Sequence, residues 1–159
     1  MTLAEILTQA MDLEQTGRDF YLKAAELPGD EATAAMFRQL AEDELAHYGY
    51  LERQLAAVQC GEDVCAIPEL GDVEPLDLND PVFPSGIDAL ESLGETYSLE
   101  EALVFAMGAE DKSYKLYRRS AEDVEEPEAK QLFLKLAAVE LKHFEALVQR
   151  YESFYSYPR

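Results

Sequence analysis

The two histidines of the chain lie in the same acidic context. His47 and His143 are the only histidines among 159 residues, and each follows a glutamate by three positions, at Glu44 and Glu140. In an α-helix this spacing places both side chains on one face. A carboxylate and an imidazole held side by side are ligands for a transition metal, so each Glu-x-x-His pair is a candidate metal-binding element.

A further glutamate lies 33 residues before each histidine, at Glu14 and Glu110. All four glutamates occupy otherwise apolar helical stripes without lysine or arginine, where an unpaired charge costs several kcal/mol. Four carboxylates and two imidazoles supply six ligands, which suit a pair of first-row metals, most naturally iron or manganese. The alternative, two ordinary core histidines with incidental glutamates, does not explain why the pattern occurs twice.

Four stretches with apolar residues at helical spacing must position these ligands. They form two predicted helical hairpins, 2–59 and 99–155, separated by residues 60–98. Asp30 is placed to cap the second helix. The third helix is expected to start at Ser98 with a capping box, and the fourth near Pro127.

The two hairpins match each other without a gap at an offset of 96 residues, and the match includes all six candidate ligands. Tyr21 and Tyr117 are one matched pair, two helical turns beyond the first glutamate of each hairpin. They are predicted to donate hydrogen bonds to ligating carboxylates, the alternative being a purely packing role. Gly17 and Ser113 leave room either for metals and a small oxidant or for close helix packing.

The stretch 60–98 contains four of the seven prolines and is predicted to be mostly loop, with a short helix at 87–93. A loop of this length is explained if it crosses between two helices that run in the same direction. We therefore predict one all-α domain over residues 1–159. Its architecture is a four-helix bundle of two pseudo-symmetric hairpins joined by a long crossover.

With a glutamate on two helices and Glu-x-x-His on the other two, the sequence resembles the rubrerythrin group of ferritin-like di-iron carboxylate proteins. The resemblance covers both hairpins and is clearest over 14–26 and 36–51. It implies a ferritin-like bundle that binds two iron ions per chain, with manganese and zinc as alternatives. His47 and His143 would each be a terminal ligand. Two choices of bridging glutamates stay open: Glu44 with Glu140, or Glu14 with Glu110.

The same resemblance implies an oxidoreductase that reduces peroxide or dioxygen at a dinuclear iron site. One alternative is a ferritin-like ferroxidase that stores or delivers iron, and another is a bundle that binds metal without turnover. A reductase of this kind would depend on a separate electron donor, such as a rubredoxin-type protein, because the chain has no four-cysteine rubredoxin module. A homodimer is expected.

Several features depart from the rubrerythrin pattern or lie outside it. Met107 stands where rubrerythrins carry an additional carboxylate, three residues before the glutamate of the third helix. Cys60 and Cys65 are too few for a four-thiolate site and are interpreted as loop thiols. The aromatic tail 151–157 is predicted to pack against a neighbouring element or subunit.

The charge balance excludes other classes of function. With 13 basic and 33 acidic residues, the net charge of −20 argues against a nucleic-acid partner, which requires clustered lysine and arginine. The longest apolar runs are far shorter than the roughly 18 residues that span a bilayer, so no membrane partner is expected. The start of the chain lacks the features of a secretory signal, and a cytoplasmic location is predicted.

Overall fold

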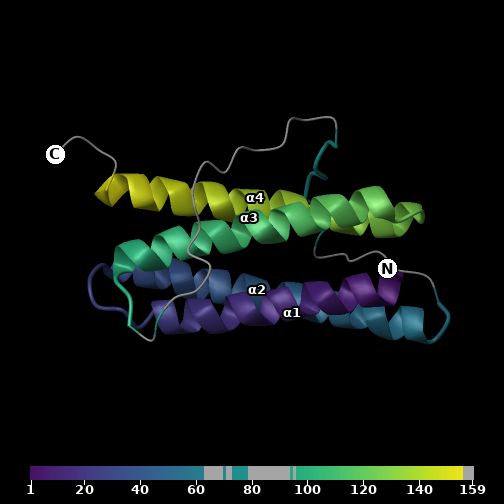
Figure 1. Cartoon of the computed structure of the whole chain (residues 1–159), viewed down its shortest axis with the longest axis horizontal. Helices are drawn as coiled ribbons and strands as arrows, with labels where there is room; N and C mark the ends of the chain where they lie inside the picture. Colours follow the sequence, from purple (N-terminus) through teal and green to yellow (C-terminus); the bar gives the residue numbers. More distant parts are fainter. Residues whose placement is uncertain (63–69, 71–72, 79–93, 95, 156–159) are drawn as a thin grey trace.

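The computed structural model describes residues 1–62, 70, 73–78, 94 and 96–155. Four helices, coloured in chain order in Figure 1, account for most of them. The predicted all-α bundle of two hairpins is confirmed, whereas the predicted short helix at 87–93 lies outside the described residues. The helices are α1 (Leu3–Ala24), α2 (Glu31–Gln59), α3 (Leu99–Asp123) and α4 (Pro127–Phe154).

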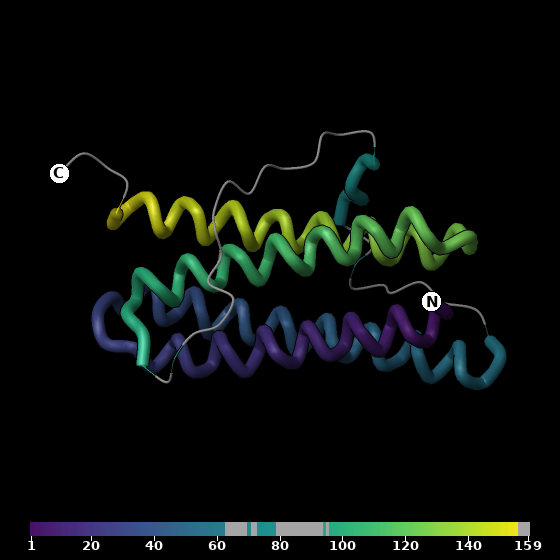
Figure 2. Tube along the Cα trace, viewed as in Figure 1, coloured from purple at the N-terminus to yellow at the C-terminus, as the bar shows by residue number. Residues whose placement is uncertain are grey.

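The directions of the helices explain why a long connection is needed. In the trace of Figure 2, α2 and α3 run the same way, so α2 ends at the opposite end of the bundle from the start of α3. A helix of 29 residues is about 43 Å long, and the chain must return over that distance. Part of the connection lies on the second hairpin, because the amide of Leu76 donates to the carbonyl of Leu134 and Arg118 donates to the carbonyl of Leu78.

The predicted helix starts are confirmed by their caps. The Asp30 carboxylate accepts a hydrogen bond from the amide of Thr33 at 2.9 Å, and Ser98 forms a reciprocal capping box with Glu101. Pro127 occupies the first position of α4, where its missing N–H costs nothing. These local signals set where each helix begins and therefore the register of the ligands along it.

The apolar core consists of two clusters related by the 96-residue repeat. Phe133 and Leu51 are fully buried in one cluster, and their repeat counterparts Phe37 and Leu147 are fully buried in the other. On α1 and α3 the two clusters lie on either side of the glutamate positions 14 and 110. The polar site is therefore packed between two apolar layers.

The described part of the aromatic tail packs on its own chain. The hydroxyl of Tyr151 donates to Glu100 at 3.1 Å, and Tyr155 is partly buried against the second cluster. Residues 156–159 lie outside the described residues. None of the described helices combines the length and the apolar character that crossing a bilayer requires.

Replacing Ser98 with alanine removes the side-chain acceptor for the amide of Glu101 at the start of α3. We expect Ser98→Ala to lower the free energy of unfolding by about 1 kcal/mol, the usual cost of losing an N-cap. Urea denaturation of the metal-free protein measures this change. The control is Thr8→Ala, at an exposed position of α1 where alanine favours the helix, so stability should not fall; equal stability of both variants would contradict the assignment of the cap.

Candidate metal centre

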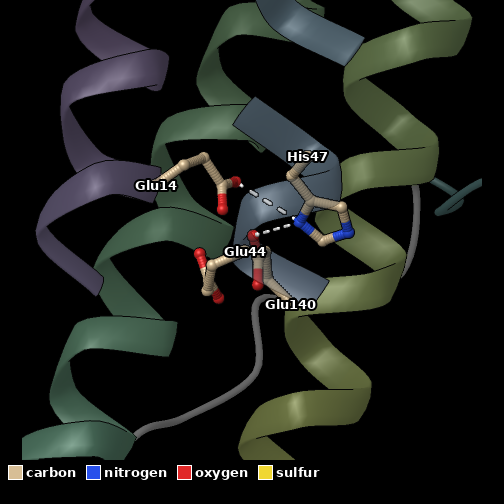
Figure 3. A group of neighbouring side chains, drawn as sticks. All are labelled: Glu14, Glu44, His47 and Glu140. Atoms are coloured by element: carbon tan, nitrogen blue, oxygen red, sulfur yellow. Dashed lines mark ion pairs between the residues drawn. The ribbon is translucent and has the colours of Figure 1, made fainter. Parts of the chain in front are cut away.

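Six side chains from all four helices converge at the middle of the bundle, and Figure 3 shows four of them. The four carboxylates are 0–3% exposed, and the two histidines are 4% and 9% exposed. The structure thus brings together every ligand that the sequence predicts. They are Glu14 on α1, Glu44 and His47 on α2, Glu110 on α3, and Glu140 and His143 on α4.

The six side chains form two groups of four that share two carboxylates. One group adds Glu14 and His47 to the shared pair, Glu44 and Glu140. The other group has the same shared pair together with Glu110 and His143. Within each group, one ligand atom per residue lies within 4.8 Å of the others. Of the two bridging choices that the sequence left open, this arrangement favours the pair on α2 and α4.

The orientation of Glu140 is the clearest sign of two adjacent positions. Its Oε1 lies 3.4 Å from Nδ1 of His47, and its Oε2 lies 3.2 Å from Nδ1 of His143. The two imidazole rings are nearly parallel, with centroids 6.0 Å apart. One carboxylate therefore presents one oxygen to each histidine and links the two groups of candidate ligands.

The two tyrosines bind the carboxylate of the opposite hairpin. The hydroxyl of Tyr21 donates to Oε1 of Glu110 at 2.6 Å, and that of Tyr117 donates to Oε1 of Glu14 at 2.5 Å. All four side chains are buried. The predicted hydrogen bonds are therefore present. They tie α1 to α3 across the pseudo-twofold axis, a crossing that spacing along one helix could not reveal.

Burial and mutual repulsion keep protons on part of the ligand set in the metal-free protein. Burial and the neighbouring carboxylates raise the pKa of Glu44 and of Glu140 well above the usual range. Burial alone would lower the pKa of His47, but the carboxylates of Glu14 and Glu140 raise it to about 10. The pKa of His143 is likewise raised against the effect of burial, chiefly by Glu110.

The other two carboxylates stay ionised. Burial favours the neutral acid, but the charge of His47 lowers the pKa of Glu14 to about 2. His143 lowers the pKa of Glu110 in the same way. Without a metal, His47 faces the ionised Glu14, and His143 faces the ionised Glu110 and Asp43. The raised pKa values of Glu44 and Glu140 favour the neutral acid at these two positions.

Several buried atoms of the site have no hydrogen-bond partner within the described part of the chain. Leaving a buried polar atom unpaired costs roughly 1–3 kcal/mol, so several at one place call for a ligand. Oxygen and imidazole donors around a common centre fit first-row metal ions. The atoms are Oε2 of Glu14, Nδ1 of His47, Oε2 of Glu110 and Oε1 of Glu140.

Asp43 is a residue beside the candidate centre that the sequence did not indicate. Its Oδ2 lies 3.1 Å from Nε2 of His143, on the far side of the ring from the carboxylate ligands. A carboxylate there fixes the tautomer that leaves Nδ1 free for a metal. The repeat counterpart of Asp43 is Val139, so symmetry could not have found it. The two histidines therefore differ in the residue next to the outer ring nitrogen, which is Asp43 for His143 and has Val139 at the counterpart position for His47.

Three other predicted positions can be placed. A Cβ on Gly17 would lie 3.4 Å from Oε2 of Glu44, so this glycine gives room to a site carboxylate. Met107 is 1% exposed in the second apolar cluster. Cys60 is an exposed free thiol after α2, and Cys65 lies outside the described residues.

The chain matches the ferritin-like domain family over residues 2–151, and it belongs to that family. It is similar to the solved structure of a hypothetical protein from Pyrococcus furiosus, Pfu-1136390-001, at 26% identity and a TM-score of 0.69. That similarity covers 96% of this chain and 89% of the archaeal one. No curated protein matches the chain significantly.

Loading the site should release protons. The pKa values of Glu44, Glu140, His47 and His143 are raised in the metal-free protein, which favours their protonated forms, so binding two divalent ions at pH 7 should release up to four protons. Affinity should therefore fall steeply as the pH is lowered. Calorimetric titration with Zn²⁺ in buffers of different ionisation enthalpy measures the number released; binding independent of pH between about 6 and 8 would contradict it.

Asp43→Asn should weaken the metal position that contains His143 and affect the other position less. Loss of a carboxylate partner on a ligating histidine typically costs 10–100-fold in affinity, so we expect a loss of about that size. Zn²⁺ titration against a chromophoric chelator measures it. Glu42→Gln, at the exposed neighbouring position, is the control, and wild-type affinity in both variants would rule out the role of Asp43.

Proposed function

We propose that the chain holds a pair of iron ions between its two hairpins and uses them to reduce peroxide or dioxygen. The observation that carries this proposal is the orientation of Glu140, whose two oxygens face two different histidines. A single-ion site would not need its central carboxylate turned toward both. Membership of the ferritin-like domain family supports the proposal but does not define the reaction.

In this proposal Glu44 and Glu140 would help to hold both ions, because they belong to both groups of candidate ligands. The remaining carboxylate of each hairpin is a terminal ligand next to one histidine. Tyr21 and Tyr117 hold those terminal carboxylates by Oε1 and leave Oε2 without a hydrogen bond. The tyrosines thus orient the ligands before any metal binds.

Two bound ferrous ions can supply one electron each, so an O–O bond is reduced without release of a radical. The chain contributes burial, because the four carboxylates are 0–3% exposed and lie between two apolar clusters. It also keeps two protonated hydroxyls beside the ligands, since burial and the neighbouring carboxylates raise the pKa of Tyr21 and of Tyr117 well above its usual value. Manganese or zinc would fit the same donors, but binding of either metal would not by itself imply reduction of peroxide or dioxygen.

Each turnover consumes two electrons, which have to be returned to the metal pair. We propose that a separate donor, such as a rubredoxin-type protein, supplies them. We also propose that the chain works as a homodimer.

The main alternative is a ferroxidase that stores or delivers iron. Storage requires a hollow assembly, so the mass of the native particle in solution separates the two functions. A dimer favours the reductase, and a large cage favours storage. A bundle that binds two ions but does not react with peroxide or dioxygen would favour a non-catalytic role.

Anaerobic titration with Fe²⁺ tests the centre directly. We expect about two ions per chain in the wild type, followed by a ferric absorbance band when hydrogen peroxide or dioxygen is added. Glu110→Ala removes a terminal carboxylate and should abolish binding of the pair. The helical circular dichroism should persist, because the core clusters are untouched.

The matched control is Glu122→Ala, which removes an exposed glutamate from the same helix and should bind iron as the wild type does. Fewer than about two ions per chain in the wild type would remove the dinuclear proposal. Unchanged loading in Glu110→Ala would show that this glutamate is not a ligand.

A further inference from the structure

The groove between α1 and α3 contains two adjoining cavities, which share Leu13, Thr16 and Lys112 as lining residues. The first has a volume of about 530 Å³ and the second about 550 Å³. Six of the nine positions that line the second cavity are the 96-residue repeat counterparts of positions that line the first. The cavities are therefore pseudo-symmetric mates, and differences between them show where the symmetry has been broken.

Only the first cavity reaches the candidate metal centre. Glu44 and Glu110 form part of its lining, and Oε2 of Glu110 is buried without a hydrogen-bond partner in the described part of the chain. The mate cavity is not lined by the counterpart carboxylates, Glu140 and Glu14. The first cavity therefore adjoins the group of candidate ligands that contains Glu110 and His143. The mate cavity adjoins neither group of candidate ligands.

Small residues open the first cavity. Gly108 and Ala109 line it, whereas the counterpart positions are Asp12 and Leu13. Gly17 also lines it, and a Cβ there would approach Glu44 to 3.4 Å. Larger side chains at these positions would narrow the approach to the carboxylates.

The first cavity has aromatic side chains at two positions where its mate has a glutamine and a leucine. Phe105 and Phe20 line the first cavity, and their counterparts in the mate are Gln9 and Leu116. A ligand of the first cavity thus has an apolar body. The volume of the first cavity is an order of magnitude above the roughly 30 Å³ that a water molecule occupies in the liquid. Hydrogen peroxide would therefore leave most of this cavity unfilled.

We propose that this cavity binds the organic group of an alkyl or aryl hydroperoxide and presents its O–O end to the site at Glu44 and Glu110. The inference rests on the proposed function and names its substrate class. The O–O bond breaks with uptake of two protons and two electrons, one from each ferrous ion, and the products are an alcohol and water. The phenylalanines hold the organic group, and selectivity over hydrogen peroxide comes from this contact.

Ala109→Leu tests the proposal, because it places in α3 the residue that α1 has at the counterpart position. The measured quantity is the ratio of kcat/KM for cumene hydroperoxide to kcat/KM for hydrogen peroxide, in which differences in iron loading cancel. We expect the ratio to fall at least tenfold. The control is Leu116→Phe, which adds bulk to the mate cavity only and should keep the wild-type ratio.

A binding measurement gives a readout that does not depend on turnover. The alcohol product of cumene hydroperoxide, 2-phenyl-2-propanol, should bind the metal-free wild type and Leu116→Phe in ligand-observed NMR. Binding should be lost in Ala109→Leu.

The two proposals fail differently. A wild type that reduces hydrogen peroxide, with an unchanged ratio and unchanged alcohol binding in Ala109→Leu, overturns the cavity assignment and leaves the proposed function standing. A wild type that binds the alcohol in the cavity but reduces neither peroxide overturns the proposed function, and with it the assigned substrate class.

Discussion

Four carboxylates buried at the middle of a helical bundle are the constraint on which the rest of the structure depends. Their charges repel one another at low dielectric, so each must be protonated, paired or bound to a cation. In the metal-free chain the two histidines pair with Glu14 and Glu110, while Glu44 and Glu140 keep their protons. Burying four carboxylates lowers the stability of the fold, and a protein retains such a cost where the same side chains are needed for function, here as candidate metal ligands.

Because of the internal repeat, each hairpin contributes two of the four buried carboxylates. The two groups of candidate ligands nevertheless differ in their surroundings, because the two repeats differ in sequence. Both hairpins contribute the same ligands and exchange tyrosine hydrogen bonds across the axis. In the described part of the chain, Asp43 contacts the outer nitrogen of His143, whereas the counterpart position, Val139, offers no such carboxylate to His47. The first of the two α1/α3 cavities opens on the same metal position. The group of candidate ligands with Glu110 and His143 therefore differs from the other group both in this contact and in the adjoining cavity.

The acidic residues of the chain divide into those of the candidate centre and those elsewhere. Of 33 acidic residues, four belong to the candidate centre and 29 do not. Others act locally, as Asp30 and Glu101 do at helix starts. The large net charge therefore says little about the reaction, whereas the position of four glutamates within apolar stripes says a great deal.

The sequence by itself determined the helices, their caps and the six candidate ligands, because periodicity, capping residues and the repeat are local or internal patterns. The tertiary structure decided which carboxylates are shared, since Glu44 and Glu140 face each other only once α2 and α4 are packed together. It also decided the crossed tyrosine contacts, the place of Asp43 and the opening of one cavity. These depend on side chains of different hairpins meeting across the bundle, and no spacing along a single helix records how closely two helices approach.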